Sequence, residues 1–293
     1  MQPLINAGFE LVFPTPGAAP NEAQLIAAVP SCIGWLAGVE KVTPAVIAAA
    51  DALRVISRNG TGVDNLPMSV IETRGIAVAR AEGANAQGVA ELALTLALAG
   101  LRDVVPTNVG MKHGDWPRRI GREMAGARVG VVGLGAIGAL FAQFCLALGA
   151  QVQGFDPFAP ANRIANHAFV RTELPGALEG ADVVSLHAPM PTDGQPLIGA
   201  DLLALLAPGA VLVNTARAGL VAPQALIAAL NAGRLGTYAT DVFETEPPEP
   251  SPLLSHPRVI LTSHIGGFTT ASVERATSMA VANLLNILHA HAD

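Results

Sequence analysis

The chain has 293 residues, of which 51% are hydrophobic and 14% charged, and its formal net charge is −6. This composition excludes a disordered chain and predicts an extensive buried core, and the length suffices for two domains. No basic stripe is present, so nucleic acid is not an expected partner.

The first residues show no charged segment followed by an apolar one, which indicates no signal peptide and favours a cytoplasmic protein. The two cysteines are then expected to be buried free thiols. Residues 129–150 are apolar over a length that could span a bilayer, but five glycines interrupt them. A buried strand, a turn and a buried helix explain this stretch better, so no membrane partner is expected. No bound metal is expected either.

Apolar runs and helical patterns alternate along the first hundred residues, which is typical of an α/β fold. The predicted strands are residues 9–13, 33–36 and 53–57, the last leading into a turn-rich loop at 58–65. Helices are predicted at 21–29 and 43–53, with Thr43 as the cap of the second. A third helix at 86–101 is apolar all round, so it should be covered on every side by its own domain or by a second subunit. Residues 112–126 are polar and irregular.

A second α/β unit begins near Arg128. A long helix is expected at 271–291. The predicted strands, enough for a doubly wound parallel sheet, are 129–132, 151–155, 183–186, 210–214, 236–241 and 259–261.

A glycine motif of the form G-x-G-x-x-G joins the first strand of this unit to the following helix, and consists of Gly133, Gly135 and Gly138. The first glycine makes the turn, the second lets backbone N–H groups approach a pyrophosphate, and the third lets helix and strand pack closely. Asp156 ends the next strand, where a carboxylate can bind the ribose diol and repel a 2′-phosphate. The motif therefore predicts NAD rather than NADP.

Three polar side chains follow the last strands of the same sheet: Arg217, Glu246 and His264. A guanidinium can hold a substrate carboxylate through two hydrogen bonds, and a histidine can take and return a hydroxyl proton. A carboxylate beside the histidine can orient it. Each residue alone has an ordinary explanation as a surface charge or a core histidine, but their joint placement predicts hydride transfer between a hydroxy acid and NAD.

With these motifs, the chain resembles the D-isomer-specific 2-hydroxyacid dehydrogenase family over nearly its whole length. The resemblance implies a Rossmann NAD-binding domain at residues 83–267, inserted in a flavodoxin-like substrate domain built from residues 1–82 and 268–293. It also implies a homodimer through the cofactor domains. By the same resemblance, Arg217 would bind the substrate, Glu246 would pair with the catalytic His264, and backbone N–H groups of Thr61 and Gly62 would hold the carboxylate. The positions that would line the cofactor are Gly133, Gly135, Ala136, Ile137, Gly138, Asp156, Thr215, Ala216, Asp241, Gly266 and Gly267.

Within the family, the chain is most similar to phosphoglycerate dehydrogenases. Arg58 and Arg118, the latter from the same chain or a partner subunit, are candidate phosphate contacts, although Ala37 stands where those enzymes usually have an arginine. Lys41 would replace that arginine only in part. A glyoxylate or hydroxypyruvate reductase is the alternative enzyme, and a non-catalytic NAD-binding dimer is the alternative of another class.

The start of the chain departs from the family pattern, in which a strand and a helix precede a second strand. Here residues 3–7 resemble the end of that helix, Gly8 its stop and residues 9–13 the second strand. The first strand has no counterpart. We therefore expect either a longer natural chain or an altered packing of residues 9–13 against the sheet.

Overall fold

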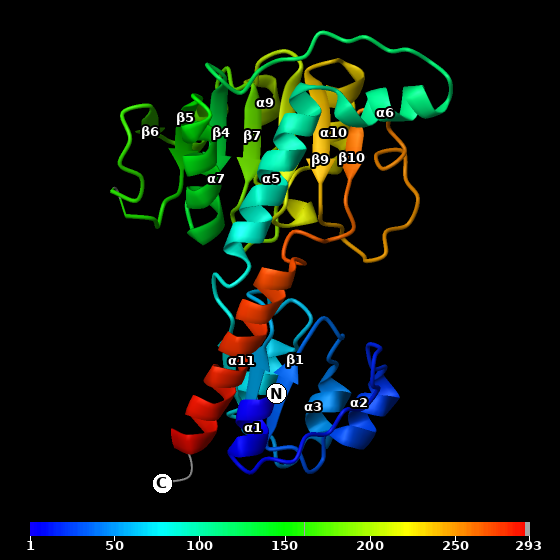
Figure 1. Ribbon diagram of the computed structural model, residues 1–293, viewed down its shortest axis with the longest axis vertical. Coiled ribbons are helices and arrows are strands. Elements are labelled where there is room, and N and C mark those ends of the chain that lie inside the picture. Colours follow the sequence, from blue (N-terminus) through cyan, green and yellow to red (C-terminus); the bar gives the residue numbers. More distant parts are fainter. Residues whose placement is uncertain (161, 291–293) are drawn as a thin grey trace. The chain divides into compact units, whose positions relative to one another are not determined.

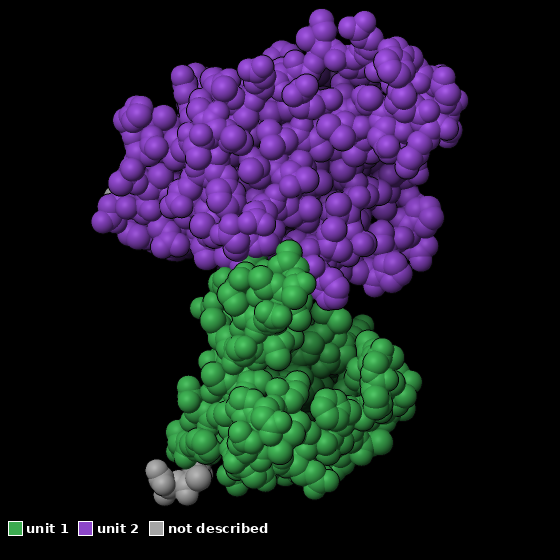
Figure 2. Space-filling view, viewed as in Figure 1, with its two compact units in different colours: residues 1–85, 269–293 green, residues 86–268 purple. Residues whose placement is uncertain are grey.

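The computed structural model describes residues 1–160 and 162–290. The chain forms two compact units, coloured separately in Figure 2: unit 1 comprises Met1–Asn85 and Thr269–Asp293, and unit 2 comprises Ala86–Phe268. These bounds lie one to three residues from those that the sequence predicts. Each unit contains its own parallel sheet (Figure 1), so the expected α/β class is confirmed.

The sheet of unit 2 has seven parallel strands in the order β10-β9-β8-β7-β4-β5-β6. The strand order reverses at β4, and ligands of such sheets bind at the carboxyl edge beside this reversal. The strands are β4 (Arg128–Val132), β5 (Gln151–Phe155), β6 (Phe169–Arg171), β7 (Val183–Leu186), β8 (Ala210–Asn214), β9 (Leu235–Thr240) and β10 (Val259–Leu261).

Helices cover both faces of this sheet (Figure 1), because alternate residues of each strand point to opposite sides. Val129 and Val131 of β4 pack with α5 (Ala86–Leu101) and α7 (Ala136–Ala147). Val132 of the same strand packs in a second cluster with α8 (Leu174–Leu178), α9 (Ala200–Ala204) and α10 (Pro223–Asn231). The predicted helix at 86–101 is thus formed and is buried largely by its own unit.

Unit 1 holds a smaller parallel sheet in the order β1-β2-β3, made of β1 (Gly34–Ala37), β2 (Val55–Arg58) and β3 (Ala77–Arg80). One face packs against α2 (Glu22–Ala28), α3 (Pro44–Ala49) and α4 (Met68–Thr73). The other packs against α1 (Gln2–Asn6) and α11 (Thr270–Ala290). The predicted end of the last helix, His291, lies outside the described residues.

The strand predicted at residues 9–13 is wrong, because this segment is not part of a sheet. Gly8 does end α1, as predicted: it has a φ of +85°, and its N–H donates to the carbonyl of Ile5. The N–H of Phe9 donates to the carbonyl of Leu4, which completes a Schellman motif. Phe9 and Leu11 instead pack their side chains against the cluster between α1, β2 and α11.

Other boundaries also differ from the sequence prediction. α3 ends at Ala49 rather than at residue 53, because the Arg74 guanidinium donates to the carbonyls of Ile47 and Ala50 at the end of the helix. The pattern missed β3, α4, β6 and α6 (Val104–Lys112). Among the described residues, no helix is both long and apolar enough to cross a membrane.

Leu284 is the side chain we expect to contribute most to the docking of α11. It is buried in unit 1, and a Cβ added to Gly34 of β1 would lie 2.9 Å from its Cδ1. Leu284→Ala should lower the free energy of unfolding by about 2–5 kcal/mol, the usual cost of a buried leucine cavity. Met279→Ala on the same helix is the control, since Met279 is exposed. Equal denaturant midpoints for the two variants would contradict this packing.

Candidate active site

The carboxyl ends of β8, β9 and β10 lie side by side, because these strands are neighbours in the sheet. The loop after β9 carries Glu246, and the loop after β10 carries His264. Arg217 follows β8 by three residues. The strand order therefore brings the three predicted catalytic residues to one edge of unit 2.

Glu246 and His264 are in direct contact. Nδ1 of His264 lies 2.8 Å from Oε1 and 2.9 Å from Oε2 of Glu246. An ionised carboxylate only accepts hydrogen bonds, so this contact places a hydrogen on Nδ1 and leaves Nε2 as the ring nitrogen that could exchange a proton. The side chains of His264 and Glu246 are 55% and 40% exposed, so the pair is open to a ligand.

Asp241 holds the loop that carries the histidine. This carboxylate is buried, and it accepts hydrogen bonds from the hydroxyl of Thr262 at 2.7 Å and from the N–H groups of Ile265 and Gly266, both at 2.8 Å. The donors lie on both sides of His264, whose φ of +55° is in the left-handed region. Such a conformation costs energy for a residue other than glycine, and surrounding contacts must hold it.

Asn214 organises the turn before Arg217. It is fully buried at the end of β8, its side-chain N–H donates to the carbonyl of Arg217 at 2.8 Å, and its Oδ1 accepts from the N–H of Ala216 at 3.1 Å. Arg217 itself is half-buried, and its Nη1 donates to the carbonyl of Ala216. Sequence reasoning did not assign functional roles to Asn214 and Thr262. Their signal was their position, at the last residue of β8 for Asn214 and directly after β10 for Thr262.

The glycine motif forms the turn expected for a dinucleotide site. Gly133 has a φ of +94°, and a Cβ on Gly138 would lie 1.9 Å from the carbonyl oxygen of Gly133. A Cβ on Gly135 would meet nothing within 4 Å, which leaves open space over the start of α7. Ala136 and Ile137 begin this 12-residue helix, which has no side-chain cap, so its first N–H groups are available to a phosphate.

Asp156 lies directly after β5 and supports the same turn. Its carboxylate accepts from the N–H groups of Leu134 at 2.7 Å, Phe158 at 2.8 Å and Ala159 at 3.0 Å. Partial burial acts to raise the pKa of Asp156, but these N–H groups and Arg171 outweigh it and hold the pKa below its ordinary value. The group is therefore ionised, and its remaining lone pairs can accept from ribose hydroxyls.

A buried hydroxyl directly after β8 supports this edge as a ligand-binding position. Oγ1 of Thr215 is buried and has no hydrogen-bond partner within the part of the chain that the structure describes. Ala216 follows it, and Gly266 and Gly267 lie in the loop that Asp241 holds. Open space over Gly135, uncapped N–H groups, an ionised Asp156 and an orphaned hydroxyl together fit a dinucleotide.

The remaining predicted residues do not follow the strands of this edge. Arg58, Thr61 and Gly62 belong to unit 1, where they follow β2 or end it. Arg118 belongs to unit 2 and is exposed in the irregular segment after α6. In the described part of the chain, no cluster of His, Cys, Asp and Glu could hold a metal ion.

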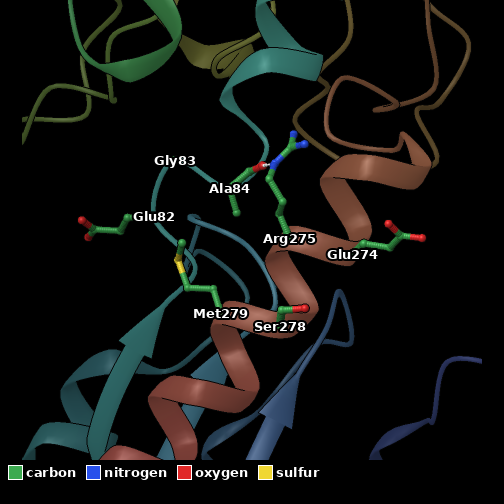
Figure 3. A pocket seen from close by; sticks show the side chains of 7 residues that line it. All are labelled: Glu82, Gly83, Ala84, Glu274, Arg275, Ser278 and Met279. Carbon is green, nitrogen blue, oxygen red and sulfur yellow. Dashed lines mark hydrogen bonds between the residues drawn. The ribbon is translucent and has the colours of Figure 1, made fainter.

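A pocket of about 610 Å³ in unit 1 contains none of the predicted site residues. It lies between residues 82–84 and the first turns of α11, where Arg275 donates to the carbonyl of Ala84 at 2.9 Å (Figure 3). Glu82 and Glu274 also line it. The hydrogen bond of Arg275 stabilises the start of α11.

Comparison with known proteins agrees with this geometry. Residues 94–266 match the family described as "D-isomer specific 2-hydroxyacid dehydrogenase, NAD binding domain". The chain is 37% identical over 260 residues to D-3-phosphoglycerate dehydrogenase of Mycobacterium tuberculosis, covering 88% of this chain and 49% of that protein. It is 38% identical over 252 residues to (S)-sulfolactate dehydrogenase of Chromohalobacter salexigens, covering 85% and 82%. A crystal structure of a protein from Thermus thermophilus superposes with a TM-score of 0.86 at 32% identity, covering 99% and 93%.

The chain therefore belongs to the D-isomer-specific 2-hydroxyacid dehydrogenase family, and unit 2 is its NAD-binding domain. It spans about half the length of the curated phosphoglycerate dehydrogenases that it matches.

The glycine motif gives a direct test of the cofactor site. Gly138→Ala should lower the melting temperature of the cofactor-free protein, because its Cβ would overlap a backbone oxygen. Gly135→Ala should leave that temperature unchanged but weaken NADH binding, since its Cβ would enter the open space that the pyrophosphate needs. Binding is measured by NADH fluorescence. Gly199→Ala, also in open space, should change neither property. Unaltered NADH affinity in the Gly135 variant would contradict this site.

Proposed function

We propose that the protein is an NAD-dependent oxidoreductase that interconverts a D-2-hydroxy acid and its 2-keto acid. The observation that carries this proposal is the contact between Glu246 and His264 at the carboxyl edge of an NAD-binding sheet. A histidine whose Nδ1 is fixed by a carboxylate can exchange a proton at Nε2 with a substrate oxygen. Binding of NAD alone does not require this arrangement.

The residues divide the reaction between them. NAD, when bound, supplies the hydride acceptor for the hydroxy acid. Nε2 of His264 takes the hydroxyl proton during oxidation and returns it to the carbonyl oxygen during reduction. Glu246 keeps the imidazole in the tautomer and orientation that this exchange requires. Asp241 fixes the loop of His264, and we also infer from the family resemblance that it contacts the nicotinamide amide.

The substrate carboxylate requires its own anchor. We propose that the guanidinium of Arg217 binds it, since a planar fork of N–H donors matches a carboxylate better than an ammonium does. The family resemblance also implies that the N–H groups of Thr61 and Gly62 bind a substrate carboxylate.

We further propose that the substrate carries a second anionic group at C3. Relatives of this chain include a phosphoglycerate dehydrogenase and a sulfolactate dehydrogenase. The sulfolactate enzyme matches over 82% of its own length, whereas the phosphoglycerate enzyme matches over 49%, so a sulfonate is a second candidate beside phosphate. Arg118 is an exposed cation that could bind such a group. Glyoxylate or hydroxypyruvate, which lack this second charge, are the alternatives.

The decisive experiment follows NADH oxidation with 3-phosphohydroxypyruvate, 3-sulfopyruvate, hydroxypyruvate and glyoxylate. The proposal predicts the largest kcat/KM for one of the two compounds with a second charge. Preference for hydroxypyruvate or glyoxylate would favour the alternative reductases. Tight NADH binding without turnover of any compound would contradict catalysis and favour a non-catalytic NAD-binding protein.

We also propose a homodimer formed through the cofactor domains. Within the described chain, α6 buries none of its residues, and it exposes Val104, Val109 and Met111. Trp116 and Ile120 continue this apolar surface in the following segment, with Trp116 76% exposed. Large apolar side chains gathered on one segment are typical of an interface between subunits. Light scattering should give twice the mass of one chain. We also expect the protein to be cytoplasmic.

Substitutions in the histidine pair test the proposed chemistry. His264→Ala should reduce kcat by about 10²- to 10⁴-fold, the usual contribution of positioned acid–base catalysis. Glu246→Gln should also reduce kcat, because an amide can hold the wrong tautomer by donating to Nδ1. Neither variant should alter NADH binding. Glu244→Gln, two residues away in the same loop, is the matched control, and an equal kcat in all these proteins would refute the pairing.

A further inference from the structure

Arg58 ends β2 and is only 8% exposed, which is unusual for an arginine next to a binding loop. Its Nε donates to the carbonyl of Gly62 at 2.8 Å, and its Nη1 donates to the carbonyl of Ala37 at 3.1 Å. Ala37 ends the neighbouring strand β1. One guanidinium therefore connects the loop after β2 to the end of the adjacent strand.

The charge of this guanidinium is balanced within unit 1. Burial lowers the pKa of Arg58, whereas Glu40 and Asp64 act to raise it. A buried cation with these two carboxylates nearby and hydrogen bonds to carbonyl oxygens is stable in place, and arginine remains protonated in such sites. Nε and Nη1 are committed to the protein backbone, and the residue is only 8% exposed, so burial leaves Arg58 little access to a ligand.

Arg58 also helps to fix the backbone of the loop after β2. The N–H of Ala81 donates to the carbonyls of Arg58, at 3.2 Å, and Gly60, at 3.1 Å, so the end of β3 holds one side of the loop. The Arg58 side chain holds the other side through the carbonyl of Gly62. Among the described residues, the N–H groups of Thr61 and Gly62 donate to no protein acceptor. The loop thus presents free donors on a backbone that is held at both ends.

We propose that Arg58 is a positioning residue that fixes the carboxylate-binding backbone of Thr61 and Gly62 and makes no contact with the C3 group of the substrate. This rests on the proposed function, and it replaces the expectation that Arg58 is a phosphate contact. Recognition of a second anionic group then belongs to other cations, and every 2-keto acid depends on Arg58 to the same degree.

Arg58→Lys is the informative variant, because an ammonium keeps the charge but lacks the planar fork that reaches two carbonyls. Arg80→Lys is the matched control: Arg80 pairs with Arg58 in register on β3 and is exposed. Glyoxylate and 3-phosphohydroxypyruvate are compared, since glyoxylate has no group beyond its aldehyde. The KM of both should rise by the same factor, about 10- to 100-fold, as expected for one lost charge-assisted hydrogen bond. The kcat and the NADH affinity should not change.

A rise of KM confined to the phosphorylated compound would overturn the proposal, and so would an unchanged KM for both. Hydrogen exchange at the Ala81 amide gives an answer that needs no turnover. It should be faster in Arg58→Lys than in Arg80→Lys, with equal exchange at the glycine motif of unit 2. If the wild type reduces no keto acid, the proposed function fails, and the role of Arg58 is then judged by hydrogen exchange alone. Equal exchange at the Ala81 amide in Arg58→Lys and Arg80→Lys would overturn that role. If the lysine variant does not fold, Arg58→Gln, which keeps one donor group, takes its place.

Discussion

The candidate active site depends on the buried carboxylate of Asp241. It accepts three hydrogen bonds from the segment 262–266, and it thereby holds His264 in a left-handed conformation that the residue would not adopt unaided. That conformation places Nδ1 of His264 against Glu246. A buried, ionised group is costly unless its oxygens are satisfied, so the loop and the carboxylate stabilise each other.

The same rule of satisfied polar groups applies around the rest of the site. Asn214 supports the turn of Arg217, Asp156 supports the glycine motif, and Arg58 supports the loop of Thr61 and Gly62. In each case a polar residue directly after a strand, or at its last position, binds the backbone of a loop. The groups proposed to contact ligands are then left on rigid backbone, which favours precise positioning of a reacting atom.

Much of this organisation could be predicted from the sequence. The α/β class, six strands of unit 2 and the glycine motif have strong local patterns, and the family followed from them. The strand at residues 9–13 was predicted wrongly, because the Schellman motif at Gly8 is a local signal but the direction of the chain after it depends on tertiary packing. The burial of Arg58 was equally hidden, since sequence shows a charge but not the carbonyl groups that surround it.

The most direct test of this account measures kcat for keto-acid reduction by Asp241→Asn at saturating NADH. In this variant an NH2 group replaces one carboxylate oxygen, and it would face at least one N–H donor of the loop. The loop of His264 should therefore shift. The account predicts a fall in kcat of about 10²-fold, the typical consequence of displacing a catalytic group by about 1 Å. A kcat equal to that of the wild type would show that Asp241 does not position His264, and it would contradict the account.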